Sequence, residues 1–176
     1  MGIEIERKFL VDMKAFTQSA EWELGFDVIS MTQGYFSSPE VLDQQKASMR
    51  VRIVHPVRFK RPRHEVPTAW LNIKSCNGGH TRQEFEYKIP VEEAQELLKL
   101  CVGSIVSKIR YVVPAGGDLV WEVDSFDGDN DGLVVAEIEL PGADHPFEKP
   151  VWVGEEVTDD LRFTNVALSS RPYKDW

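Results

Sequence analysis

Apolar and charged residues alternate with a period of two along most of this sequence, and this pattern restricts the folds that the chain can adopt. Successive side chains of a β-strand point to opposite faces, so each alternating segment predicts a strand with one apolar and one charged face. Glycine-rich turn sequences such as Gly116-Gly117-Asp118 separate several segments and favour an antiparallel arrangement. The segments that predict strands are residues 3–11, 27–36, 48–55, 70–76, 81–89, 107–113, 119–126 and 133–140.

Two other segments carry apolar residues at helical spacing. Residues 91–101 form the first, and residues 158–169 form the second, with Thr158 as the predicted N-cap and two aspartates in the first turn, where the helix dipole favours them. A weaker pattern predicts a short helix over residues 13–19, and three prolines predict a long loop over residues 56–67. The chain is thus predicted to be mainly β (α+β).

Length and composition exclude several classes of protein. The 176 residues suffice for one domain, predicted to span residues 1–176. The net charge of −9 argues against general nucleic-acid binding, and no apolar run approaches the roughly 20 residues of a spanning helix. Two cysteines exclude a disulfide scaffold, and the first residues do not resemble a secretion signal. We expect a cytoplasmic protein that binds neither membranes nor nucleic acid; a homodimer is compatible with the sequence.

The charged residues of the predicted strands share one face of the sheet. A solvated sheet face would show the same alternation. However, same-sign pairs at positions i and i+2 repel each other without structural gain, and nearly every strand carries one. This favours a closed barrel of about eight strands with charges inside and helices over the apolar outside. The charged side chains are Glu4, Glu6, Lys8, Arg50, Arg52, Lys74, Glu84, Glu86, Lys88, Lys108, Arg110, Glu122, Asp124, Glu137 and Glu139.

These motifs resemble a known family. Glu4-Ile5-Glu6-Arg7-Lys8 matches the ExExK signature of the CYTH superfamily, the triphosphate tunnel metalloenzymes, and the later charged pairs follow in the family's order. Gln33-Gly34-Tyr35-Phe36 resembles the family's second strand, and the segment containing Asn165 resembles its C-terminal helix. The resemblance spans essentially the whole chain. It implies an eight-stranded antiparallel closed β-barrel, the triphosphate tunnel, and hydrolysis or cyclisation of triphosphates with Mg²⁺ or Mn²⁺.

The resemblance also implies roles for the charged residues. Hard divalent cations prefer oxygen ligands, and arginine and lysine bind phosphate oxygens. Lys88 and Glu122 are expected nearer the tunnel mouth, and the general base is not assigned. The expected metal ligands are Glu4, Glu6, Asp124, Glu137 and Glu139; the expected substrate-binding residues are Lys8, Arg50, Arg52, Lys74, Lys108 and Arg110; and the expected catalytic residues are Glu84, Glu86 and Lys8.

The leading functional prediction is metal-dependent hydrolysis of inorganic triphosphate to diphosphate and phosphate, with this small triphosphate as the chain's partner. A class IV-type adenylate cyclase is one alternative, although no adenine site is evident. Thiamine triphosphatase is another, but Ser48 and Met49 stand beside Arg50 where an aromatic residue is wanted. A polyphosphate- or nucleotide-binding module without activity would keep the bases and lose the acids. This chain keeps both, which favours an enzyme.

Overall fold

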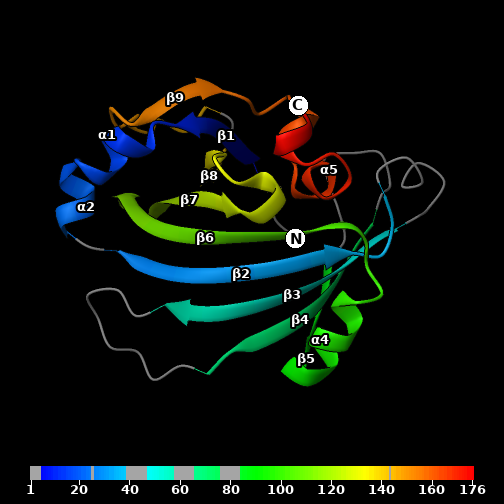
Figure 1. The fold of residues 1–176 in the computed structure, drawn as a ribbon. Coiled ribbons are helices and arrows are strands. Elements are labelled where there is room, and N and C mark those ends of the chain that lie inside the picture. The colour runs from blue at the N-terminus through cyan, green and yellow to red at the C-terminus, as the bar shows by residue number, and fades with distance from the viewer. Residues whose placement is uncertain (1–4, 25, 39–46, 58–65, 76–83, 143) are drawn as a thin grey trace.

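A computed structural model describes residues 5–24, 26–38, 47–57, 66–75, 84–142 and 144–176. They form one antiparallel nine-stranded sheet in the order β5-β4-β3-β2-β6-β7-β8-β1-β9 (Figure 1). The strands are β1 (Ile5–Val11), β2 (Asp27–Tyr35), β3 (Ala47–Val57), β4 (Thr68–Ser75), β5 (Glu84–Ile89), β6 (Val102–Gly116), β7 (Leu119–Asp127), β8 (Val134–Leu140) and β9 (Val153–Glu156).

The antiparallel, mainly β architecture is confirmed, with two differences from the sequence prediction. The four-residue β9 is too short to show a periodic pattern; it pairs with β1 across a register shift. Strand β3 continues through Pro56 to Val57, so the loop expected over residues 56–67 begins later. Residues 58–65 of that loop lie outside the described residues, and so do residues 76 and 81–83 of two predicted strands.

The two ends of the strand order, β5 and β9, are not joined by any pairing in the described part of the chain. Figure 1 shows the sheet curling from β5 at the bottom to β9 at the top. The structure therefore supports a strongly curved sheet, and the closed barrel is not confirmed.

Helices cover most of the apolar outer face, as expected. Helices α1 (Met13–Thr17) and α2 (Ala20–Leu24) lie over an aromatic cluster that includes Phe9, Trp121 and Trp152. Farther along the sheet, α4 (Val91–Leu98) covers a second cluster, which contains Val51, Ile53, Ala69 and Ala94. The helix predicted over residues 91–101 is therefore confirmed, with an end three residues earlier.

The C-terminal segment departs from the prediction of one helix over residues 158–169. It forms the 3₁₀ turn η2 (Leu161–Phe163) and then α5 (Asn165–Ser170), which is capped by Thr164 rather than Thr158. The Thr158 hydroxyl instead accepts a hydrogen bond of 3.0 Å from the backbone N–H of Lys8 in β1, which holds this residue to the sheet.

Helix α5 packs against the inner face of the sheet. Its Leu168 is buried in a cluster with Val106, Phe126 and Val135. These three strand residues share the face of Lys108, Asp124 and Glu137 because they lie an even number of positions away. One end of the charged face is thus apolar and is closed by α5, contrary to the expectation that all helices lie outside.

Two further 3₁₀ turns, η1 (Gly128–Asn130) and η3 (Tyr173–Asp175), complete the fold. The described residues contain no helix with the length and apolar character required to cross a bilayer.

Candidate functional site

The inner face of the sheet holds a cavity of about 350 Å³, which we call the charged cavity. Its lining comes from the eight strands β1 to β8 and from α5, so residues far apart in the sequence converge on it. The lining residues are Glu6, Lys8, Met31, Gln33, Arg50, Arg52, Lys74, Glu84, Glu86, Lys108, Arg110, Glu122, Glu137, Glu139 and Asn165.

The structure brings together nearly all the predicted site residues that it describes. Six acidic and six basic side chains line the charged cavity, and Asp124 lies directly behind two of the bases. Glu122, expected at the mouth, is part of the lining. Lys88 is exposed on β5 and does not belong to it. Glu4, a predicted metal ligand, lies outside the described residues.

A buried ion-pair network forms the floor of the charged cavity. Asp124 accepts two hydrogen bonds of 2.7 Å from Arg110 and a third from the Lys108 ammonium group. The side chains of Lys108 and Asp124 are each only 2% exposed. Burial alone would raise the pKa of Asp124, but these two cations outweigh it and lower the pKa. Both carboxylate oxygens are therefore engaged, and Asp124 holds the two cations in place.

A second group of charges joins β1 to β8. The Lys8 ammonium lies 2.9 Å from Glu137 and 3.4 Å from Glu6. Burial would lower the pKa of Lys8, but the two carboxylates outweigh it and raise the pKa. The pKa of Glu6 is itself raised, first by burial and then by the nearby Glu137 carboxylate. The pKa of Glu137 is lowered, because Lys8, Lys108 and Arg110 together outweigh its burial.

Like charges also face each other across neighbouring strands. Glu6 lies opposite Glu139, and Glu122 lies opposite Glu137. Such pairs are destabilising unless a cation lies between them, and Arg110 pairs with both Glu122 and Glu137. Carboxylate oxygens are the ligands that Mg²⁺ and Mn²⁺ prefer, so the donor chemistry fits such an ion. Among the described residues, however, no three His, Cys, Asp or Glu side chains lie close enough to form a complete metal-binding cluster.

Two arginines of β3 line the cavity beside its acidic half. The Nε atoms of Arg50 and Arg52 are buried and have no hydrogen-bond partner within the described part of the chain. Burial and the positive charge of Arg50 lower the pKa of Arg52. A buried charged donor without a partner is costly, and a phosphate oxygen would supply the missing acceptor.

The predicted catalytic acids on β5 are held by an asparagine that the sequence interpretation missed. Asn72 is buried, and its amide donates hydrogen bonds to Glu84, at 3.3 Å, and to Glu86. Each carboxylate also pairs with a cation: Glu84 with Lys74 at 3.0 Å, and Glu86 with Arg52 at 3.4 Å. Asn72 stands two positions before Lys74, so the alternation contained the signal that it shares the charged face.

Three other lining residues also carry no predicted role. Gln33 is buried and donates a hydrogen bond of 3.3 Å to the Tyr35 hydroxyl, and Met31 supplies an apolar contact surface. Asn165, at the start of α5, accepts a hydrogen bond of 3.4 Å from Lys108. Only the tertiary contact of α5 with the inner face brings Asn165 into the site.

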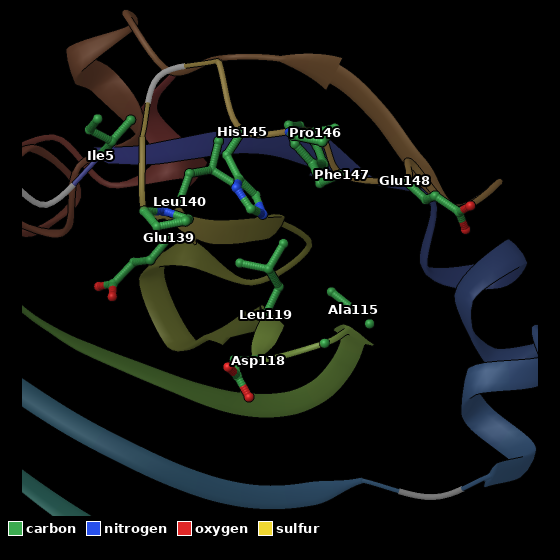
Figure 2. Close-up of a pocket in the computed structure, with 13 residues that line it drawn as sticks. Ile5, Ala115, Asp118, Leu119, Glu139, Leu140, His145, Pro146, Phe147 and Glu148 are labelled. Carbon is green, nitrogen blue, oxygen red and sulfur yellow. The ribbon is translucent and has the colours of Figure 1, made fainter.

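A larger pocket of about 780 Å³ lies at the β6–β7 turn and is mainly apolar (Figure 2). Leu119, Leu140 and Phe147 point into it, and His145 lies at its edge. Among the described residues that line it there is no lysine or arginine, so it lacks the cations that a phosphate chain requires. The smaller charged cavity is therefore the better candidate for the functional site.

Comparison with known proteins places this geometry in context. The CYTH domain model matches residues 2–172. An inorganic triphosphatase of Acetivibrio thermocellus is 40% identical over 177 residues, covering 100% of this chain and 99% of the relative. An inorganic triphosphatase of Nitrosomonas europaea is 32% identical over 94% of this chain and 96% of its own length. A crystal structure of an inorganic triphosphatase superposes with a TM-score of 0.65 at 30% identity, covering 96% of this chain and 95% of the other.

Proposed function

The chain belongs to the CYTH family, and from this premise we propose that it hydrolyses inorganic triphosphate to diphosphate and phosphate in the charged cavity. Two curated relatives that match almost the whole chain are inorganic triphosphatases, which bears out the prediction of a phosphoanhydride hydrolase. The observation that carries the choice of substrate is the pair Arg50 and Arg52, whose buried Nε donors have no partner among the described residues.

The basic residues bind and orient the phosphate chain. Arg50 and Arg52 donate to it from one side of the cavity, while Lys108 and Arg110 donate from the floor, where Asp124 holds them. Lys8 and Lys74 complete the clamp. Positioning and charge neutralisation provide most of the catalysis in phosphoryl transfer, so this arrangement suits a substrate with several linked phosphates. We place the substrate on the concave face, surrounded by the sheet as in the tunnel that the family resemblance implies.

The acidic half of the cavity is the proposed place of a divalent metal ion. Glu6, Glu137 and Glu139, together with Glu4 of the ExExK motif, would hold Mg²⁺ or Mn²⁺. When bound, such an ion neutralises phosphate charge and lowers the pKa of a coordinated water. Asp124 was also expected to be a metal ligand; the hydrogen bonds that its oxygens accept from Lys108 and Arg110 support a role in positioning these two cations.

Glu84 and Glu86 are the proposed acceptors for the proton of the attacking water. Both carboxylates reach the cavity from β5, and Asn72 fixes their orientation. Their pairing with Lys74 and Arg52 also couples the position of the acids to that of the phosphate clamp. Lys8, between Glu6 and Glu137, is placed to stabilise the charge that develops on the phosphoryl oxygens.

A phosphate-release screen tests the reaction. Protein freed of metal with EDTA is assayed on inorganic triphosphate, ATP and thiamine triphosphate, with Mg²⁺ or Mn²⁺ added back. We expect metal-dependent release that is fastest with inorganic triphosphate. Diphosphate and a cyclic nucleotide from ATP would indicate the cyclase instead, and binding of triphosphate without release under any condition would indicate a binding module.

A pair of arginine variants tests the site. Arg52→Gln removes a charged donor to phosphate, worth roughly 1.5–3 kcal/mol, and is expected to raise the KM for triphosphate about 10- to 100-fold. Arg7→Gln is the matched control, because Arg7 lies on the outer face, stacked 5.0 Å from the Phe147 ring. Equal effects of the two substitutions would show that the charged cavity does not bind the substrate.

A further inference from the structure

The turn η1, between β7 and β8, holds a buried asparagine that the proposed reaction does not use. Asn130 is fully buried, and both of its polar groups are engaged. Its amide donates a hydrogen bond of 3.5 Å to the Leu168 carbonyl in α5, and its carbonyl oxygen accepts one of 2.8 Å from the backbone N–H of Tyr173. One side chain therefore joins this turn to α5 and to the turn η3 that follows it.

The neighbouring Asp129 strengthens the same attachment. Its carboxylate accepts a hydrogen bond of 2.7 Å from the Ser104 hydroxyl in β6 and another of 2.7 Å from the Lys174 ammonium group in η3. The backbone of α5 also lies so close to Gly103 of β6 that a Cβ atom there would stand 2.4 Å from the Ser169 carbonyl oxygen. Helix α5 is thus held by η1 and by β6.

These external contacts decide where α5 lies. The helix spans six residues, and a helix this short is not stable by itself in water. It carries Leu168 into the apolar cluster with Phe126 and places Asn165 in the lining of the charged cavity. A change in the position of α5 would therefore change one end of that cavity.

Lys108 is the cation of the charged cavity that lies at this end. Its ammonium group donates a hydrogen bond of 3.4 Å to Asn165 and lies 5.4 Å from the centre of the Phe126 ring, which packs in the same cluster as Leu168. Its side chain is only 2% exposed. Attraction between a cation and a phosphate is stronger where water is excluded, so this cover increases what Lys108 contributes to binding.

We propose that Asn130 is a positioning residue for the phosphate clamp. By fixing α5, it holds the Lys108 ammonium group in place and away from water, although Asn130 itself does not line the charged cavity. The inference rests on the proposed function, because it takes Lys108 as a donor to phosphate. It extends that function to a turn outside the site.

The kinetics of Asn130→Ala test this role. Lys108 would bind phosphate in the ground state as well as in the transition state, so its displacement should raise the KM for triphosphate about tenfold and leave kcat nearly unchanged. A merely structural role predicts the reverse, because a fraction of unfolded protein lowers the apparent kcat at constant KM. Ser19→Ala is the matched control: Ser19 is also buried and accepts a hydrogen bond of 3.3 Å from the Trp22 backbone in α2, so KM should not change.

Chemical labelling tests the same inference without hydrolysis. Metal-free protein in EDTA is treated with acetic anhydride, and mass spectrometry compares Lys108 with Lys99, whose side chain is 67% exposed. In the parent protein Lys108 should react far more slowly than Lys99. In Asn130→Ala the ratio of Lys108 to Lys99 labelling should rise several-fold, because α5 no longer covers the amine as firmly.

A second variant displaces α5 without changing Asn130. In Gly103→Ala the new Cβ would force the Ser169 carbonyl away, so KM and Lys108 labelling should both rise as in Asn130→Ala. Gly116→Ala is its control, because φ is positive there too but the new Cβ would meet no atom. This pair of variants decides the question if Asn130→Ala does not fold.

Two results would overturn the proposal: a KM that stays at the parent value in the folded variants Asn130→Ala and Gly103→Ala, or Lys108 labelling that stays at the parent level in both. Either result would leave triphosphate hydrolysis by the parent protein intact. If the parent protein itself releases no phosphate, the proposed function fails, whereas the labelling still shows whether Asn130 holds α5 over Lys108.

Discussion

The substitution Asp124→Asn is expected to destabilise the protein strongly, although it changes only one atom type. It removes the negative charge between Lys108 and Arg110. Arg110 retains Glu122 and Glu137, but Lys108 retains only the Asn165 oxygen at 3.4 Å among its hydrogen-bond partners within the described residues. Burial already lowers the pKa of Lys108, and Asp124 provides the largest opposing contribution. Without Asp124, Lys108 would be a buried charge that has lost its ion-pair partner, and only the weaker influence of Glu137 would oppose its burial.

The expected loss in the free energy of unfolding follows from the way in which Lys108 avoids being a buried, unpaired charge. It can lose its proton, and the free energy required is set by the distance between its ordinary pKa of 10.5 and the pH of the assay. At about pH 7.5 this distance is about 3 units, or about 4 kcal/mol. The figure agrees with the roughly 3–5 kcal/mol lost when one partner of a buried ion pair is removed.

The free energy of unfolding of the variant should also depend on pH. We expect the native variant to hold Lys108 without its proton, so that the unfolded state binds one more proton than the native state. Stability of the variant should therefore rise by about 1.4 kcal/mol per pH unit as the pH increases toward the unfolded pKa. In the parent protein Asp124 opposes the lowering of the Lys108 pKa, so the rise should be smaller there. Urea unfolding in EDTA at pH values from about 7 to 9 measures both quantities.

Asp160→Asn is the matched control. Asp160 also pairs with an arginine, Arg162, but their side chains are 31% and 63% exposed. Asparagine preserves the cap of η2, and the pair is screened by solvent, so the expected loss is small and does not depend on pH in this range. If Asp124→Asn costs no more than this control, the charged floor is solvated and the buried network is wrong.

Two further perturbations test other parts of the structure. Gly103→Ala should lower the free energy of unfolding by more than the roughly 1–2 kcal/mol that a left-handed conformation costs, because φ is +71° at Gly103 and the new Cβ would clash with the Ser169 carbonyl. Gly116→Ala is the control: φ there is +92°, but the new Cβ would meet no atom, so urea unfolding should show the conformational cost alone. The hydrogen bond from Arg7 lowers the pKa of Glu156 from 4.5 to about 2. The contribution of this ion pair to stability is therefore present above about pH 4.5 and is lost as the pH falls through 2. This contribution is at most about 1 kcal/mol for so exposed a pair, and Glu156→Gln should erase it in acid-unfolding curves; equal curves for the two proteins would contradict the pairing.

The sequence by itself determined eight of the nine strands and the division of their side chains between two faces. Both follow from a local rule, because a period of two assigns a face to each residue without knowledge of its neighbours. Glu6, Lys108 and Glu137 could therefore be predicted to converge. The ExExK motif and the order of the charged pairs also sufficed to indicate the CYTH family, which the family model over residues 2–172 confirms.

Only the tertiary structure decided how those charges are partnered. The burial of Asp124 between Lys108 and Arg110 depends on the register of β6 and β7 and on the cover above them, and no local pattern encodes either. The same holds for the C-terminal segment, where the sequence predicted Thr158 as the cap of the helix. Strand β1 binds the Thr158 hydroxyl, so the helix begins after Thr164 and carries Asn165 into the cavity. Competition between local capping and long-range pairing is settled by the contacts of the folded chain, because only there do both partners lie within hydrogen-bond distance.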